Sequence, residues 1–161
     1  MAVVGCGSVG TETAKRFGAL GCRVIGVDLF PRSDEVYEKI YPLTELDGCL
    51  SQADIVVLTL PLTDETRGLF DENRFAVMKQ DSVLVNIARG AVVDEKALLT
   101  ALDEKLFGAV LDVFEDEPLG VENALWGKEN AIITPHNSFV GEGNSKRLFD
   151  VIIKNLTVAG I

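Results

Sequence analysis

Basic residues and long apolar runs are scarce in this sequence, and each shortage excludes a class of partner. Lysine and arginine number 15 against 25 acidic residues, which gives a net charge of −10. Nucleic acids and anionic membrane surfaces are bound by clustered lysine and arginine, so neither is an expected partner. No apolar stretch approaches the roughly 20 residues that span a bilayer. Met1 is followed at once by apolar residues rather than by a basic leader, so we expect no secretory signal.

Cysteine is also scarce, with three residues at Cys6, Cys22 and Cys49. Their number is odd and their spacing is unlike that of metal ligands. Two of them fall where a buried strand or turn is expected. We therefore expect reduced thiols, no bound metal and a cytoplasmic protein.

What the sequence does have, near its start, is three glycines at the spacing Gly-x-Gly-x-x-Gly: Gly5, Gly7 and Gly10. In a dinucleotide-binding turn the first makes the tight turn, the second lets the backbone approach a pyrophosphate, and the third lets helix pack on strand. The phosphates would lie at the N-terminus of the helix expected at 11–20. A flexible turn is the alternative interpretation, because the chain contains 15 glycines.

An acid, Asp28, ends the second apolar run. A carboxylate at that place accepts hydrogen bonds from the adenosine ribose and repels a 2′-phosphate, which favours NAD over NADP. Arg32 in the following loop is the counter-argument, because a guanidinium can accommodate the extra phosphate. NAD is the expected cofactor.

Short apolar runs alternate with helical patterns along the whole chain, which predicts right-handed βαβ units and a parallel sheet. Thr44, Asp71 and Asp94 precede three of the helical patterns as N-caps. The expected fold is α/β, a doubly wound parallel sheet of the Rossmann type in three layers. The expected strands are 3–4, 22–28, 41–43, 54–60, 82–87, 107–113 and 131–134, and the expected helices are 11–20, 45–50, 72–78, 95–104 and 143–158.

Ligands of such a sheet bind at the carboxyl ends of the strands, so polar residues there are candidate functional residues. Arg89 follows one strand, and its guanidinium suits a carboxylate because it offers two parallel hydrogen bonds. His136 follows the last strand and is the only histidine in the chain. Imidazole gives or takes a proton near neutrality. The alternatives are a surface arginine in a turn and a structural histidine.

An acidic loop, Glu115-Asp116-Glu117, follows the strand expected at 107–113. A carboxylate in contact with His136 would stabilise the imidazolium. Composition does not rank the three acids, and a solvated acidic turn is the alternative.

Taken together, these residues resemble the D-isomer-specific 2-hydroxyacid dehydrogenases, the family of D-lactate, glycerate and 3-phosphoglycerate dehydrogenases. The resemblance covers nearly the whole chain, and several motifs occur in the family's order. The matching stretches are 5–10, 60–68, 86–90, 94–95, 111–118 and 134–136.

The resemblance implies an NAD-dependent interconversion of a D-2-hydroxy acid and a 2-oxo acid by hydride transfer. It implies that Arg89 binds the substrate carboxylate, that His136 is the acid/base and that Glu117 is its partner. It also implies that Asp112 contacts the nicotinamide carboxamide. The implied cofactor-binding residues are Gly5, Gly7, Ser8, Val9, Gly10, Asp28, Pro61, Thr66, Ile87 and Asp112.

Two departures from the family pattern stand out. Thr59 occupies a place where many members have histidine, and Asn137-Ser138-Phe139 follows His136 where small residues are usual. Members of the family also carry a substrate domain, and we expect that domain to be missing from this chain. We expect one dinucleotide-binding domain over 1–161, a terminal helix at 141–161 that returns toward that substrate domain, and a homodimer of the complete enzyme. An NAD-binding sensor or interaction module without turnover is the alternative function.

Overall fold

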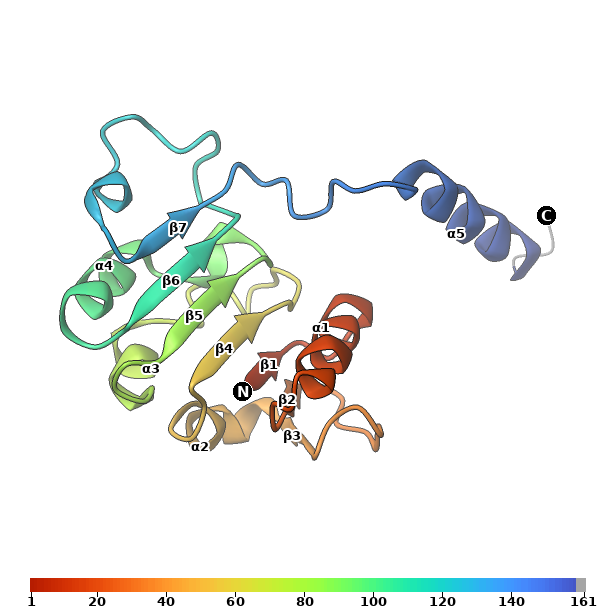
Figure 1. Ribbon diagram of the computed structural model, residues 1–161, viewed down its shortest axis with the longest axis horizontal. Coiled ribbons are helices and arrows are strands. Elements are labelled where there is room, and N and C mark those ends of the chain that lie inside the picture. The colour runs from red at the N-terminus through yellow and green to blue at the C-terminus, as the bar shows by residue number, and fades with distance from the viewer. Residues whose placement is uncertain (159–161) are drawn as a thin grey trace.

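A single parallel sheet organises the molecule. The computed structural model describes residues 1–158, and its seven strands have the order β3-β2-β1-β4-β5-β6-β7 (Figure 1). The chain starts in the middle of the sheet, moves outward to β3 and crosses back to β4, so the predicted doubly wound fold is confirmed. The strands are Ala2–Val4 (β1), Ile25–Asp28 (β2), Ile40–Pro42 (β3), Ile55–Leu58 (β4), Val83–Asn86 (β5), Gly108–Leu111 (β6) and Ala131–Ile133 (β7).

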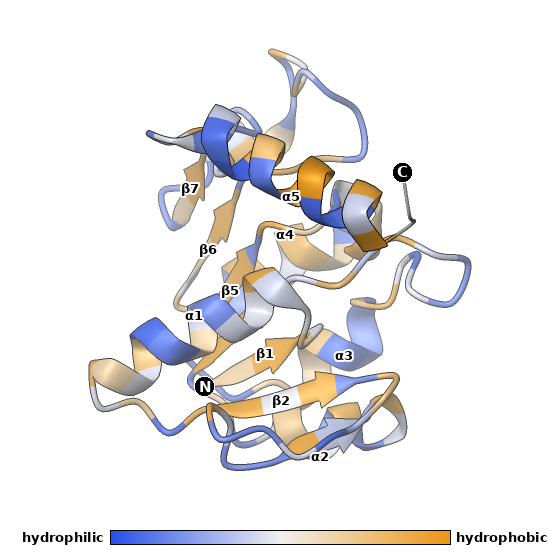
Figure 2. Cartoon of the chain, turned by 90° about the vertical axis from the view of Figure 1, so that its right-hand side faces the viewer, coloured by the Kyte–Doolittle hydropathy of each residue, from blue (hydrophilic) through white to orange (hydrophobic). Residues whose placement is uncertain are grey.

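Helices cover both faces of the sheet, as Figure 2 shows with α1 in front and α3 behind. Ala14 of α1 packs with Val3 and Cys6 on one face. The helices α2, α3 and α4 pack in series on the other face. The helices are Ser8–Ala19 (α1), Leu46–Leu50 (α2), Glu72–Val77 (α3), Glu95–Glu104 (α4) and Asn144–Val158 (α5), with 3₁₀ turns at Leu43–Glu45 (η1), Gly90–Val92 (η2) and Ala124–Gly127 (η3).

Two of the three predicted N-caps form. The Asp71 carboxylate accepts from the Arg74 N–H at 2.9 Å, and the Asp94 carboxylate accepts from the Ala97 N–H at 2.8 Å. The predicted cap at Thr44 is wrong, because Thr44 lies inside η1 and α2 begins only after it.

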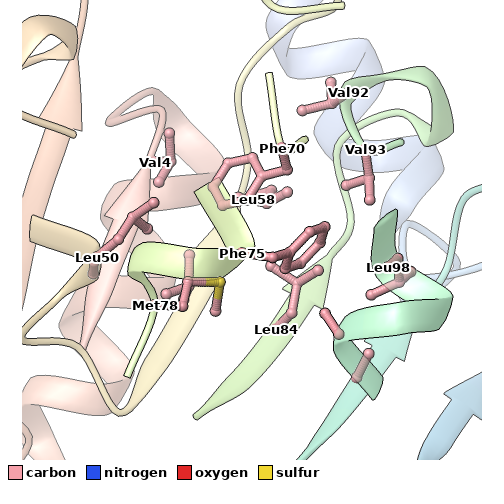
Figure 3. Close-up of a cluster of buried hydrophobic side chains, with 14 of the residues drawn as sticks. Val4, Leu50, Leu58, Phe70, Phe75, Met78, Leu84, Val92, Val93 and Leu98 are labelled. Carbon is pink, nitrogen blue, oxygen red and sulfur yellow. The ribbon is translucent and has the colours of Figure 1, made fainter. Parts of the chain in front are cut away.

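The larger apolar core lies between the sheet and the α2, α3 and α4 layer. Figure 3 shows Leu58 and Leu84 of the sheet against Phe75 and Met78 of the α3 segment. The rings of Phe70 and Phe75 meet edge to face with their centroids 6.2 Å apart. This packing holds the middle strands in place and therefore holds the loops at their carboxyl ends.

The helix α5 stands away from the sheet, at the end of an extended segment (Figure 1). It has one apolar side, as predicted, but Leu148, Ile152 and Leu156 on that side are exposed by 63%, 46% and 40%. The last part of the helix predicted at 141–161, residues 159–161, lies outside the described residues. Within residues 1–158, no helix has both the length and the apolar character of a membrane span.

Candidate functional site

The glycine turn between β1 and α1 has two crowded glycines and one open one. Gly5 has φ +97°, and a Cβ on it would lie 2.6 Å from the Leu60 nitrogen. A Cβ on Gly10 would lie 2.1 Å from the Gly5 carbonyl oxygen, whereas nothing lies within 4 Å of a Cβ on Gly7. The first and third glycines therefore satisfy packing, and the second leaves an exposed backbone surface that a phosphate can approach.

The N-terminus of α1 provides the hydrogen-bond donors. The helix begins at Ser8, earlier than predicted, with Gly7 as an N-cap that contributes no side-chain bond. The first helical N–H groups therefore have no partner within the helix, and the first turn contains no acid. Ser8 and Val9 lie in this exposed first turn. Free N–H groups at the positive end of a helix fit a pyrophosphate.

Asp28 lies directly beside this turn. Its Oδ2 accepts from the Cys6 N–H at 2.7 Å, and its Oδ1 accepts from the Phe30 N–H at 3.0 Å. The carboxylate lines two hollows, one of about 640 Å³ over Gly7 and Ser8 and one of about 190 Å³ with a mainly apolar wall. This is the position between a phosphate site and a base site that a ribose would occupy.

Arg32 also faces the glycine turn. Its Nη2 donates to the Cys6 carbonyl at 2.5 Å and lies 3.7 Å from the Asp34 carboxylate. The Cys6 N–H is therefore bound by the Asp28 carboxylate, and the Cys6 carbonyl by the Arg32 guanidinium. Both predicted determinants of cofactor choice lie at the same hollow.

Pro61 and Thr66 line the smaller hollow together with Asp28. The Thr66 hydroxyl donates to the Pro61 carbonyl at 2.8 Å and accepts from the Thr63 N–H at 2.8 Å. Because Thr66 is buried, its side chain shapes this loop from inside. Thr59 donates to the Gly5 carbonyl at 2.6 Å, so the residue that replaces the more usual histidine stabilises the glycine turn.

Asn86 holds the turn that carries Arg89. Its Oδ1 accepts from the Ala88 N–H at 3.1 Å, and its Nδ2 donates to the Arg89 carbonyl at 3.2 Å. Ile87 lies in this turn, half-buried, and the Arg89 side chain is exposed, with Nη1 donating to the Ala88 carbonyl. This role of Asn86 was not predicted from the sequence, although an amide at the end of a buried strand is the signal that points to it.

The Arg89 turn packs against the acidic loop after β6. A Cβ on Gly90 would lie 1.8 Å from the Phe114 carbonyl carbon, so only glycine allows this approach. The Phe114 N–H in turn donates to Oε1 of Glu117 at 2.9 Å. Arg89 and Glu117 therefore belong to adjoining loops at the same edge of the sheet.

Glu117 and His136 form a direct pair. Nδ1 of His136 lies 2.7 Å from Oε2 of Glu117. The hydrogen bond from His136, together with the one from the Phe114 N–H, lowers the pKa of Glu117 below its ordinary value. An ionised carboxylate only accepts, so Nδ1 carries the proton of this hydrogen bond, and Nε2 is the ring nitrogen that Glu117 does not contact.

The other two acids of the loop take no part in this pair. Glu115 forms an exposed ion pair with Arg67 at 3.3 Å, and Asp116 is exposed. The structure thereby distinguishes among three acids that composition could not rank. The Phe139 ring also meets the imidazole of His136 edge to face, at a centroid distance of 6.2 Å.

A cavity of about 360 Å³ adjoins the pair. His136 and Glu117 form part of its wall, and the rest is mainly apolar, from Phe114, Leu119 and Trp126. The pair itself remains open to solvent, since the side chains of His136 and Glu117 are 39% and 34% exposed. Within residues 1–158, no group of three or more histidine, cysteine or acidic side chains is arranged to hold a metal ion.

The fold and the turn at α1 define a dinucleotide-binding domain of the doubly wound class. Residues 1–138 match the family model described as D-isomer specific 2-hydroxyacid dehydrogenase, NAD binding domain. The chain therefore belongs to the D-isomer-specific 2-hydroxyacid dehydrogenase family. The predicted resemblance and the expected nicotinamide dinucleotide cofactor are confirmed at this level.

The relatives are oxidoreductases of small acids. The chain is 39% identical over 158 residues to an (S)-sulfolactate dehydrogenase of Chromohalobacter salexigens, an alignment that covers 97% of the chain and 51% of that protein. It is 36% identical over 157 residues to a hydroxypyruvate reductase of Blautia hydrogenotrophica, with 97% of the chain and 48% of that protein covered. The chain thus spans about half the length of these relatives.

Solved structures agree with this assignment. A D-isomer specific 2-hydroxyacid dehydrogenase from Xanthobacter autotrophicus, in complex with NADPH and MES, superposes with a TM-score of 0.88 at 36% identity, covering 99% of this chain and 66% of that one. An NADPH-dependent glyoxylate/hydroxypyruvate reductase from Sinorhizobium meliloti, in complex with NADP and sulfate, has a TM-score of 0.88 at 33% identity and covers 99% of this chain and 52% of that one.

Proposed function

We propose that this chain is the cofactor-binding part of an NAD-dependent enzyme that interconverts a D-2-hydroxy acid and a 2-oxo acid. The observation that carries the proposal is the 2.7 Å pair of His136 and Glu117, which lies beside the Arg89 loop at the carboxyl edge of the sheet. A proton-exchanging imidazole, a cation for the substrate carboxylate and a phosphate-binding turn at one edge are the parts that such a reaction needs.

The cofactor supplies the hydride acceptor or donor when bound, and this chain's residues hold it. The backbone of Gly5, Gly7, Ser8, Val9 and Gly10 would bind the pyrophosphate. Pro61 and Thr66 would line the adenine side, and Ile87 would contact the nicotinamide ribose. The Asp28 carboxylate favours the free 2′-hydroxyl of NAD, while Arg32 at the same hollow lowers the discrimination against NADP.

His136 exchanges the proton of the reacting oxygen. In the oxidation direction Nε2 accepts the hydroxyl proton, and in the reduction direction it donates a proton to the 2-oxo oxygen. Glu117 stabilises the imidazolium that forms in between, and Arg89 holds the substrate carboxylate so that the reacting carbon keeps one orientation.

The complete enzyme would contain more than these residues. We place the substrate domain outside this chain, with α5 returning toward it, because the apolar side of α5 is exposed here. A homodimer in the cytoplasm is the expected assembly and location, in keeping with the unpaired thiols of Cys6, Cys22 and Cys49.

Exchange of His136 for alanine in the complete enzyme tests the proposal. We expect His136→Ala to lower kcat by about 100-fold or more, the usual contribution of general acid/base catalysis, with NADH affinity by calorimetry unchanged. Glu117→Gln should lower kcat less, and Glu115→Gln is the matched control because Glu115 does not touch the imidazole. Normal turnover by His136→Ala on a panel of 2-oxo acids would refute the role. NADH binding without turnover in the unmodified enzyme would indicate a sensor instead.

A further inference from the structure

Three donors from the segment after β7 converge on the buried carboxylate of Asp112. The Thr134 hydroxyl and the Asn137 N–H donate to Oδ1 at 2.5 and 3.0 Å, and the Ser138 N–H donates to Oδ2 at 2.9 Å. These donors precede and follow His136 along the chain. The carboxylate therefore ties down the backbone on both sides of the imidazole-bearing residue.

The backbone of His136 itself has an uncommon conformation. Its φ is +50°, in the left-handed region that residues with a side chain rarely adopt. Its N–H donates to the Thr134 carbonyl at 3.1 Å, which closes a tight turn around Pro135. Such a conformation persists only where the surrounding structure enforces it. The bonds from Thr134, Asn137 and Ser138 to Asp112 flank this residue on both sides.

We propose that Asp112 is a positioning residue that holds His136 in this left-handed turn, so that Nδ1 meets Glu117. This inference rests on the proposed role of His136 as the acid/base. It gives Asp112 a role distinct from the nicotinamide contact that the family resemblance implies.

The surroundings of Asp112 suit this role. The residue is 1% exposed and forms no ion pair within residues 1–158. A buried charge without a cation is costly unless hydrogen bonds stabilise it. Burial raises the pKa of Asp112, but the hydrogen bonds from Ser138, Thr134 and Asn137 outweigh it and hold the pKa at about 2. The carboxylate is therefore ionised at neutral pH and acts only as an acceptor, which matches three converging donors.

Kinetics of Asp112→Asn in the complete enzyme separate positioning from cofactor binding. The amide keeps one acceptor oxygen but presents an N–H group to the remaining donor. We expect kcat to fall by about 10-fold or more with the Kd of NADH within about 3-fold of the original value. Asp116→Asn, an exposed acid of the neighbouring loop, is the charge-matched control and should change neither quantity. A 10-fold loss of NADH affinity with kcat at saturation unchanged would overturn the proposal in favour of the nicotinamide contact.

The imidazole provides a readout that needs neither substrate nor cofactor. Because the chain has one histidine, its imidazole ¹⁵N resonances report His136 alone. At fixed pH, Asp112→Asn should shift them toward their positions in Glu117→Gln while the amide resonances of the sheet stay in place. Thr134→Val removes one of the three donors to Asp112 and should shift the imidazole resonances in the same direction by a smaller amount. This variant replaces Asp112→Asn in the experiment if Asp112→Asn does not fold. Unchanged imidazole resonances in a folded variant would refute the positioning role, whereas failure of the catalytic proposal would show in His136→Ala alone.

Discussion

The two ends of the candidate site are built by different means. At the β1–α1 end, the shape of the candidate site depends on backbone geometry, since its walls are glycines, helix N–H groups and one carboxylate. At the β5–β7 end, side chains hold the backbone near the candidate catalytic residues: Asn86 donates to the Arg89 carbonyl, and Asp112 accepts from residues on both sides of His136. We call residues 5–10 with Asp28 the nucleotide end, and the loops that carry Arg89, Glu117 and His136 the chemical end. We expect the nucleotide end to lose cofactor binding when a side chain adds atoms to the glycine turn. We expect the chemical end to lose activity when a hydrogen bond that positions its side chains is removed.

The first prediction breaks the nucleotide end by adding a single methyl group. Gly10→Ala places a Cβ against the Gly5 carbonyl, so we expect it to lower the melting temperature and to weaken NADH binding by about 100-fold or more. Gly7→Ala meets no protein atom and should leave the melting temperature unchanged, yet still weaken NADH binding because the methyl group occupies the phosphate approach. Equal melting temperatures for the two variants would contradict the assignment of separate roles to these glycines.

The second prediction breaks the chemical end at its cation. Arg89→Lys keeps the charge but loses the planar fork that grips a carboxylate, so we expect the KM of the 2-oxo acid to rise by about 10- to 100-fold. NADH affinity should stay the same, since the pyrophosphate turn lies at the other end. Steady-state kinetics of the complete enzyme measure both, and Arg67→Lys, in an exposed ion pair, is the matched control. An unchanged KM would remove Arg89 from substrate binding.

The third prediction concerns Asp28, the residue of the nucleotide end whose side chain, rather than its backbone, faces the candidate cofactor site. Asp28→Asn keeps an acceptor for the Cys6 N–H but removes the charge. We expect NADH affinity to fall by about 10-fold and NADPH affinity to change little or improve. Arg32→Ala should show the opposite selectivity, with the loss confined to NADPH. Fluorescence titration with both cofactors gives the four dissociation constants, and parallel changes for NADH and NADPH would count against both assignments.

Much of this arrangement could be predicted from sequence because its determinants are local. Alternating apolar runs and turns predict a doubly wound sheet, and the topology of such a sheet brings strand ends together. The caps at Asp71 and Asp94 were predictable for the same reason, since a cap depends on a residue and the helix that follows it. The predicted strands were too long at β2, β4, β5, β6 and β7, because the sequence pattern continues beyond the residues that pair with a neighbouring strand.

The contacts that hold the candidate catalytic residues were not predictable, because they join segments far apart in sequence. Nothing in the acidic loop distinguishes Glu117 from its neighbours until the loop is placed against His136. The convergence of Thr134, Asn137 and Ser138 on Asp112 depends on the spatial order of β6 and β7. Resemblance to a family supplied the pairing of Glu117 with His136, but not the hydrogen bonds that Asn86 and Asp112 make.

The last prediction compares the two ends by their response to acid. The folded-state pKa of Asp112 is about 2, against 3.8 for an ordinary aspartate, and that of Glu117 is also lowered. The unfolded chain therefore binds more protons between these values, so the stabilisation is present above about pH 4 and is lost as the pH falls toward 2. We expect Asp112→Asn to remove about 2 kcal/mol of the pH-dependent part of the free energy of unfolding, measured by urea unfolding at a series of pH values. Gly7→Ala changes only the nucleotide end, so its free energy of unfolding should depend on pH as that of the original chain does. If the free energy of unfolding of Asp112→Asn fell with pH as steeply as that of the original chain, the acid sensitivity would arise elsewhere. The chemical end would then not depend on this buried carboxylate.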